Sequence, residues 1–299
     1  MAPVGPRHNA SCVSTPGSVP RRETIHPLLA VAAMVVGVAG MPVPIWVAQL
    51  AAARGHALGL RPLLMASELM LVVPAVLLLV SLRRPLAASL ALGGVDRTGA
   101  TVAVCAGAAL WAASVGLMEM QSIFWPPSEA FLETFRVLHA ALQPKNAFDA
   151  AVSVLAIAVF PAVCEEILFR GVVLPSLARL LGAAGAVLGS ALLFGAIHYD
   201  AVGGASGFTR VPFAIAVGIG LGLLRVRTGS LVAPILAHAV LNTITFATVL
   251  ALGIDTEMDN PEPLLSAVML VGGTALAAIA LRHARPPLTP PEPAPRLGR

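Results

Sequence analysis

The chain alternates between long apolar runs and short polar connections. A helix rises about 1.5 Å per residue, so apolar runs of about 17 to 25 residues cross the hydrocarbon core of a bilayer. The runs do not alternate apolar and polar residues as the strands of a membrane barrel do. We therefore predict an all-α fold, a polytopic transmembrane helical bundle of about eight spans. The predicted spans are residues 28–50, 63–81, 99–118, 147–169, 183–199, 208–224, 231–253 and 264–281.

The composition supports a membrane protein and argues against a nucleic-acid partner. Hydrophobic residues make up 57% of the chain and charged residues 11%, with a mean hydropathy of +0.86. Such a chain cannot build a water-soluble surface of ordinary polarity. The formal charge of +4 comes from basic residues that stand one or two at a time beside apolar spans, which is typical of topology signals. The lipid bilayer is the predicted partner.

The charged connections predict an orientation. An even number of spans puts both termini on one side of the membrane. Basic residues follow spans two, six and eight, whereas the connection between spans seven and eight is acidic. The basic residues are Arg83, Arg84, Arg97, Arg225, Arg227, Arg282 and Arg285, and the acidic ones are Asp255, Glu257, Asp259 and Glu262. Because positive residues prefer the cytoplasm, both termini are predicted inside, with Arg54 and Arg61 as mild exceptions.

The two ends of the chain are predicted to be disordered tails. Residues 1–26 are rich in Pro, Ser and Arg and do not resemble a cleaved signal peptide, and residues 286–299 are rich in Pro. Residues 27–285 form the predicted transmembrane domain. Within it, the connection 120–146 carries Phe131, Phe135, Leu138 and Leu142 at helical spacing, which predicts an amphipathic helix in the membrane interface.

Two carboxylates and a guanidinium stand in one apolar span. Ionisable groups at this depth cost several kcal/mol and are tolerated where they pair or face a cavity. Glu166 and Arg170 are four residues apart, the spacing of a helical ion pair. Glu165 points about 100° away and has no local partner. Since burial disfavours its charged form, we predict Glu165 as a general base. Pro161, four residues earlier, frees a backbone carbonyl and suits the wall of a wet cavity.

Three further polar residues occur on later spans. Glu165 and His198 are equidistant from the glycine-rich stretch at 181–185, which reads as a turn, so a helical hairpin brings them to the same height. His238 and Asn242 are four residues apart and face one direction on span seven. The depth of His238 relative to His198 stays open at this point. We predict one site built from the three clusters.

The three clusters match a known pattern in the same order. They read as EExxxR from Glu165 to Arg170, FxxxH from Phe194 to His198, and HxxxN from His238 to Asn242. This set resembles the CPBP family of intramembrane proteases, which includes the type II CAAX prenyl proteases and bacteriocin-processing or immunity-type proteins of bacteria. The resemblance covers about residues 147–250, the motif core. The connection 120–146 and both tails match no known pattern.

The resemblance implies an endopeptidase in a bacterial-type cell membrane. Glu165, helped by His198, would activate a water for attack on a peptide carbonyl of a membrane-anchored protein or peptide. His238 and Asn242 would stabilise the oxyanion. The physical reading agrees, since His and Asn donors stabilise developing negative charge in a dry site. The implied catalytic set is Glu165, Glu166, Arg170, His198, His238 and Asn242; no cofactor is firmly predicted, and a divalent metal such as zinc is the open alternative.

Three alternatives stay open. A zinc-dependent version of the protease would hold the metal with Glu165, His198 and His238, although HExxH is absent and Cys12, Cys105 and Cys164 show no zinc-thiolate spacing. The stretch at 204–207 resembles the nucleophile motif of rhomboid serine proteases, with Ser206 as nucleophile. A non-enzymatic transporter or scaffold would use the buried acids and histidines as a relay, but no inverted repeat is apparent.

Overall fold

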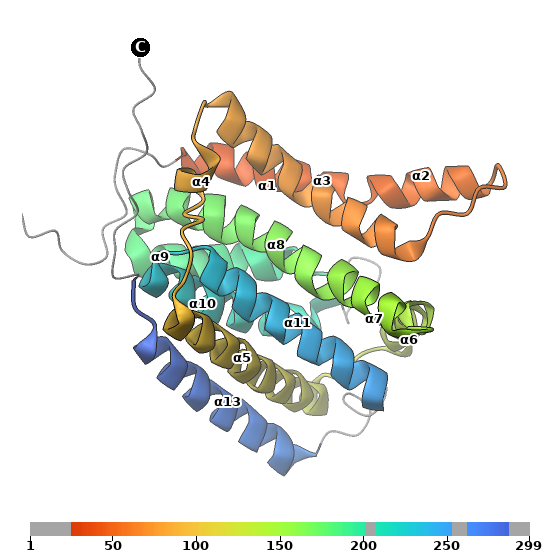
Figure 1. Ribbon diagram of the computed structural model, residues 1–299. Helices are drawn as coiled ribbons and strands as arrows, with labels where there is room; N and C mark the ends of the chain where they lie inside the picture. The colour runs from red at the N-terminus through yellow and green to blue at the C-terminus, as the bar shows by residue number, and fades with distance from the viewer. Residues whose placement is uncertain (1–24, 201–206, 253–261, 287–299) are drawn as a thin grey trace, which may run out of the picture.

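A computed structural model describes residues 25–200, 207–252 and 262–286, and every regular element in this part of the chain is a helix (Figure 1). The predicted all-α membrane bundle is therefore confirmed. Both predicted tails lie almost wholly outside the described residues. The helices, with two π-helical stretches named η1 and η2, are α1 (Pro27–Gly40), α2 (Val43–Ala52), α3 (Leu60–Ser81), α4 (Leu86–Ser89), α5 (Arg97–Phe124), α6 (Glu129–Leu142), α7 (Ala147–Val154), η1 (Leu155–Val159), α8 (Phe160–Glu166), η2 (Ile167–Val173), α9 (Leu174–Ala196), α10 (Val211–Thr228), α11 (Val232–Leu252) and α13 (Pro263–His283).

Seven helical runs in the described residues are long and apolar enough to cross a membrane. The difference from the predicted eight lies in one run, Ala147–Ala196, which has 50 residues. At about 1.5 Å per residue this run is more than twice as long as a bilayer requires. At Gly182 the backbone leaves the helical region, with φ 69° and ψ 179°, and the chain reverses (Figure 1). The single run therefore supplies two of the predicted spans.

Contacts between the two legs confirm the predicted hairpin. The Ser190 hydroxyl donates to the carbonyl of Phe169 at 3.3 Å. The rings of Phe169 and Phe194 meet edge to face, with centroids 5.1 Å apart. These two phenylalanines are nearly equidistant from Gly182 along the chain, as an antiparallel helical pair requires. The hairpin carries two of the three motifs and sets their relative height.

Gly182 is the residue whose backbone conformation makes the hairpin possible. Its φ and ψ fall in a region that only glycine adopts readily, and a side chain there costs about 1–3 kcal/mol. Gly182→Ala is expected to lower the free energy of unfolding by that amount, measured by denaturation in mild detergent. Gly272→Ala is the matched control, because a Cβ at Gly272 meets no atom within 4 Å and its φ is not positive. Equal effects of the two changes would contradict the role assigned to Gly182.

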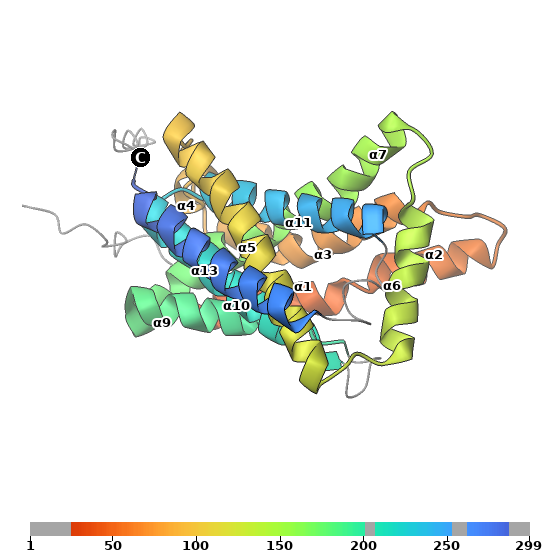
Figure 2. The ribbon, with the colours of Figure 1, turned by 90° about the horizontal axis from the view of Figure 1, so that it is seen from below.

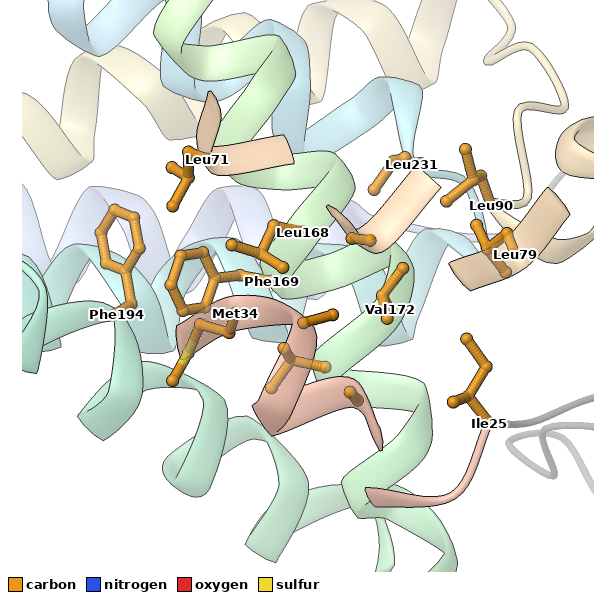
Figure 3. Close-up of a cluster of buried hydrophobic side chains, with 14 of the residues drawn as sticks. Ile25, Met34, Leu71, Leu79, Leu90, Leu168, Phe169, Val172, Phe194 and Leu231 are labelled. Atoms are coloured by element: carbon orange, nitrogen blue, oxygen red, sulfur yellow. The ribbon is translucent and has the colours of Figure 1, made fainter. Parts of the chain in front are cut away.

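A buried cluster of large side chains holds the hairpin against the N-terminal helices (Figure 3). Leu71 from α3 and Met34 from α1 pack with Phe169 and Val172 of η2 and with Phe194 of α9. The large apolar residues on the outer faces of the spans are exposed instead, as lipid contact requires. The core thus surrounds η2, the segment that follows the two carboxylates.

Helices α5 and α13 pack closely and share a polar contact that the sequence analysis missed. A Cβ on Gly116 would lie 2.4 Å from the backbone nitrogen of Leu270, so only glycine permits this approach. Glu119, which is 8% exposed, accepts a hydrogen bond of 2.6 Å from the Ser266 hydroxyl. Such a bond between helices satisfies a carboxylate that lipid would otherwise surround.

Both ends of the described chain lie at the same end of the bundle (Figure 1), as an even number of crossings predicts. Of the two arginines that depart from the predicted charge rule, Arg61 has a structural partner. Its Nη1 lies 3.2 Å from Asp149 Oδ1 and its Nε donates to Ser153 at 2.8 Å. Arg61 therefore ties the start of α3 to α7, a role that explains its position without a topology signal.

Helix α6 lies across one end of the bundle, turned away from the direction of the spans (Figure 2). Its N-terminus is capped by Ser128, whose hydroxyl accepts from the backbone N–H of Phe131. Phe131 and Leu132 are buried, while Glu129 and Glu133 on the outer face interact with Arg136. This arrangement agrees with the amphipathic helix predicted for 120–146.

Candidate active site

The two adjacent carboxylates lie on a helix whose regular hydrogen bonding is interrupted on both sides. Helix α8 carries Glu165 and Glu166, with η1 before it and η2 after it. Pro161, in the first turn of α8, has no N–H to donate. The disturbance predicted at Pro161 thus takes the form of a π-helical turn, a feature frequent at functional sites.

Glu166 and Arg170 form the predicted ion pair in the interior of the bundle. Arg170 Nη1 lies 2.7 Å from Glu166 Oε1, and neither side chain has any exposed surface. Arg170 Nη2 donates to the carbonyl of Gly218 on α10 at 3.0 Å. Its guanidinium carbon lies 4.7 Å from the centroid of the Phe194 ring, a cation–π contact. The pair therefore links the two legs of the hairpin to α10.

His238 lies between the two carboxylates. Its Nδ1 is 3.0 Å from Glu166 Oε1, and its Nε2 is 3.6 Å from Glu165 Oε2. The first distance is a hydrogen bond and the second is too long for one. His238 is 4% exposed, and the Phe194 ring meets it edge to face at 5.9 Å. The depth of His238, which the sequence left open, is therefore the depth of Glu165 and Glu166.

His198 also contacts the Phe194 ring. The two ring centroids are 4.6 Å apart, and His198 Nδ1 is 2.8 Å from the Phe194 carbonyl, to which it can donate. Removal from water, with the positive charge of Arg210 as a second cause, lowers the pKa of His198 just beyond the end of α9. A neutral ring that donates from Nδ1 leaves Nε2 as an acceptor. Among the described residues, no hydrogen bond or ion pair joins His198 to Glu165.

Asn242 contacts the same helix from α11. Its side-chain nitrogen lies 3.4 Å from the carbonyl of Ala158 in η1, and the residue is half-buried. His238 contacts α8, and Asn242 contacts η1 one turn away. The two side chains therefore share one face of α11, as predicted. The structure thus brings Glu165, Glu166, Arg170 and His238 into contact, with His198 joined through Phe194.

Two charged residues near the site were missed by the sequence analysis. Glu68, on α3, interacts electrostatically with Glu165 and Cys164, and its Oε2 is buried without a hydrogen-bond partner. A lone carboxylate inside predicted span 63–81 was the available signal. Arg210 interacts electrostatically with Glu165 and precedes α10. Nothing in the sequence distinguishes Arg210 from other arginines at the ends of spans.

The donor set of the zinc alternative does not converge in this arrangement. Within residues 25–200, 207–252 and 262–286, no three His, Cys, Asp or Glu side chains are grouped so that they could hold a metal ion. Glu165, His198 and His238 therefore do not fit a metal as placed, and the mechanism below uses none. Ser206, the nucleophile of the rhomboid alternative, lies outside the described residues.

A cavity of about 430 Å³ opens between the end of α5 and the start of α10. It is lined by Gln121, Trp125, Phe208, Thr209 and Pro212. Thr209 is 4% exposed, and its hydroxyl has no hydrogen-bond partner among the described residues. Because Thr209 directly precedes Arg210, the cavity adjoins the chain segment that carries this cation.

Comparison with known proteins gives one finding for the region that builds the site. Residues 147–244 match the family described as type II CAAX prenyl endopeptidase, Rce1-like. No curated protein and no solved structure matches the chain. The matched region runs from the start of α7 to two residues beyond Asn242, so it contains all three motifs. The resemblance stated from those motifs is thereby confirmed: over residues 147–244 this integral membrane protein is similar to the Rce1-like type II CAAX prenyl endopeptidases, which is consistent with a CPBP family protease.

Proposed function

We propose that this protein is an intramembrane endopeptidase in which Glu165 activates a water to hydrolyse a peptide bond of a membrane-associated substrate. One observation carries the assignment of the base. Glu166 is occupied by Arg170 at 2.7 Å and by His238 at 3.0 Å, whereas Glu165 makes no hydrogen bond to another described residue and lies 3.6 Å from His238 Nε2. Of the two adjacent carboxylates, Glu165 is therefore the one free to accept a proton.

The proposed reaction needs no covalent intermediate with the protein. The Glu165 carboxylate takes a proton from water as the water oxygen bonds to the carbonyl carbon, and the carbonyl electron pair moves onto oxygen. The C–N bond then breaks and its electron pair stays on nitrogen, which takes the proton back from Glu165. The products are a carboxylic acid and an amine, and the base is regenerated.

His198 supports this step as an acceptor in the proposed mechanism. Its Nδ1 is engaged by the Phe194 carbonyl, which leaves Nε2 unprotonated in the neutral ring. A neutral imidazole can accept a hydrogen bond from the attacking water and so orient it. No hydrogen bond joins His198 directly to Glu165 among the described residues, and in the proposed mechanism the attacking water bridges the two side chains.

His238 and Asn242 are the proposed donors to the oxyanion. Because Nδ1 of His238 faces the acceptor Glu166, the ring donates from Nε2 only when both nitrogens carry protons. The mechanism therefore requires an imidazolium at His238 when the oxyanion forms. Asn242 has a second N–H beyond the one directed at Ala158. Donors placed in this way typically contribute about 10²- to 10³-fold to kcat.

The proposed orientation places both termini in the cytoplasm. The ends of α3, α10 and α13 and the start of α5 gather at one end of the bundle (Figure 1). On or directly beside these elements lie four basic residues, Arg84, Arg97, Arg225 and Arg282. The positive-inside rule assigns that end to the cytoplasm.

Cleavage of a library of membrane-anchored peptides in vesicles tests the function. We expect products with the purified wild type and none with Glu165→Ala; the same products from both would remove the protease assignment and favour a transporter or scaffold.

Ser206→Ala is expected to cleave normally, and loss of activity in that variant would favour the serine mechanism. Stoichiometric zinc in the purified protein, together with loss of activity on chelation, would replace the metal-free mechanism.

A further inference from the structure

Helices α1 and α3, which form one edge of the bundle, enclose an open groove on its surface (Figure 1). The groove has a volume of about 350 Å³ and runs from Leu29 to Val36 on α1 and from Pro74 to Ser81 on α3. At about 1.5 Å per helical residue, each wall is about 10 Å long. None of the lining residues belongs to the candidate active site.

The groove begins beside a close contact between the two helices. A Cβ on Gly37 would lie 2.3 Å from the carbonyl oxygen of Leu71, so only glycine permits this approach. From there toward the start of α1, the α1 wall of the groove includes the small side chains Ala32 and Ala33. These side chains leave the space between the helices unfilled, so a hollow remains on the outer face.

The lining of the groove is apolar and faces lipid. Leu29, Val36 and Leu77 are exposed on helices that are long and apolar enough to cross a membrane. The hydroxyl of Ser81 at the end of the groove already donates to the carbonyl of Leu78 at 2.9 Å. Water in such a hollow would find few hydrogen-bond partners, whereas a hydrocarbon chain loses none. The lining therefore suits an acyl chain.

Two polar side chains stand at the end of the groove where α1 begins and α3 ends. Arg83 follows Ser81 by two residues, is exposed, and makes no hydrogen bond or ion pair with another described residue. His26 caps α1, and its Nδ1 accepts from the N–H of Leu28 at 3.3 Å. The neutral ring then carries its proton on Nε2, as a donor. Residues 25–67 and 69–95 contain no Asp or Glu, so neither wall supplies an anion at this end.

We propose that this groove binds one phospholipid with an anionic headgroup. One acyl chain lies between α1 and α3, and the phosphate accepts hydrogen bonds from Arg83 and His26. The arginine favours a lipid of net negative charge over a zwitterionic one. The headgroup end is the one that the proposed orientation assigns to the cytoplasm, the leaflet that carries anionic lipids. The bound lipid braces α1 against α3, whose buried side chains pack around η2.

Competition between two lipids with the same acyl chains tests the proposal. The purified full-length protein in a neutral detergent receives equal amounts of phosphatidylglycerol and phosphatidylcholine, and native mass spectrometry counts the lipid that stays bound. We expect one phosphatidylglycerol per protein, bound at least about fivefold more tightly than phosphatidylcholine. Glycerol phosphate, which has no acyl chain, should not displace it. Equal binding of the two lipids, or displacement by glycerol phosphate, would overturn the proposal.

Substitutions in each half of the site complete the test. Ala32→Leu fills the groove and is expected to weaken phosphatidylglycerol binding at least about fivefold. Ala39→Leu, at an exposed position of α1 outside the groove, is the matched control and should bind as the wild type does. Arg83→Gln should bind both lipids equally, whereas Arg97→Gln, an exposed arginine at the same end on α5, should keep the preference.

The thermal unfolding midpoint separates lipid binding from misfolding. Without lipid, all four variants should unfold near the temperature of the wild type. Phosphatidylglycerol should raise the midpoint of the wild type and both controls, but not that of Ala32→Leu. Equal behaviour of Ala32→Leu and Ala39→Leu, or a preference that survives Arg83→Gln, would contradict the lipid site. A lipid-free dimer that Ala32→Leu dissociates would assign the groove to a second copy of the chain. Because none of these measurements uses cleavage, they are independent of the endopeptidase function.

Discussion

Glu165→Gln is expected to lower kcat about a thousandfold while the protein stays folded in the membrane. Glutamine has nearly the same shape but cannot accept the proton of the attacking water, and general-base catalysis contributes about 10²- to 10⁴-fold. Glu165 has no hydrogen bond to another described residue and lies 3.6 Å from His238, so its replacement breaks no strong contact within the described part of the chain. The measurement is single-turnover cleavage of a peptide selected from the library, with KM determined separately.

Glu119→Gln is the matched control for this change. Glu119 is another buried carboxylate, placed on α5 and bonded to Ser266 of α13. Glutamine can still accept that hydrogen bond, so kcat should change by less than about threefold. A large loss in both variants would indicate that any buried charge change disturbs the bundle. A loss of less than tenfold for Glu165→Gln would show that another group is the base.

Arg170→Met is expected to destabilise the protein by about 3–5 kcal/mol, the largest effect on stability that the structure implies. The change removes one partner of an ion pair that has no exposed surface and leaves the buried Glu166 carboxylate with His238 as its one remaining hydrogen-bond partner among the described residues. It also removes the bond to Gly218 and the stacking on Phe194. The free energy of unfolding in mixed detergent micelles measures the loss.

The double variant Glu166→Gln with Arg170→Met is the informative comparison. Removing both charges eliminates the uncompensated carboxylate, so the double variant should be more stable than Arg170→Met alone. Arg225→Met provides the control, because Arg225 is half-buried on α10 and makes no ion pair among the described residues; its cost should stay below about 1 kcal/mol. If Arg170→Met and Arg225→Met cost the same, the ion pair does not stabilise the interior.

The fold and its site together suggest why the carboxylates are adjacent. On one helix, Glu166 pairs with Arg170 in the interior, whereas Glu165 interacts electrostatically with Glu68 and Arg210. The first carboxylate can then hold the helices and His238 in place, and the second can react. The His238 imidazole contacts both carboxylates. A structural change at Glu166 would therefore be transmitted to Glu165 through His238.

Sequence alone determined the class of the protein, the hairpin and the identity of the motif residues. Apolar run length decides membrane spanning because a bilayer has a nearly constant thickness. The turn at Gly182 follows from local glycine content, and the Glu166–Arg170 pair follows from helical periodicity, since both depend on residues close together in the chain. Ionisable residues within the spans are also informative. The free-energy cost of burying them depends on their depth in the membrane, and that depth follows from their position along an apolar run.

Only the tertiary structure decided which side chains meet across helices. How α3, α10 and α11 rotate and shift against α8 determines the position of His238 against both carboxylates and its contact with the Phe194 ring. The same packing determines the electrostatic interaction of Glu68 and Arg210 with Glu165. A helix in lipid can rotate without changing its hydropathy pattern, so the pattern does not determine this register. Packing does, because the buried Glu166–Arg170 pair and the close contacts at glycine residues limit how the helices can rotate and shift against one another.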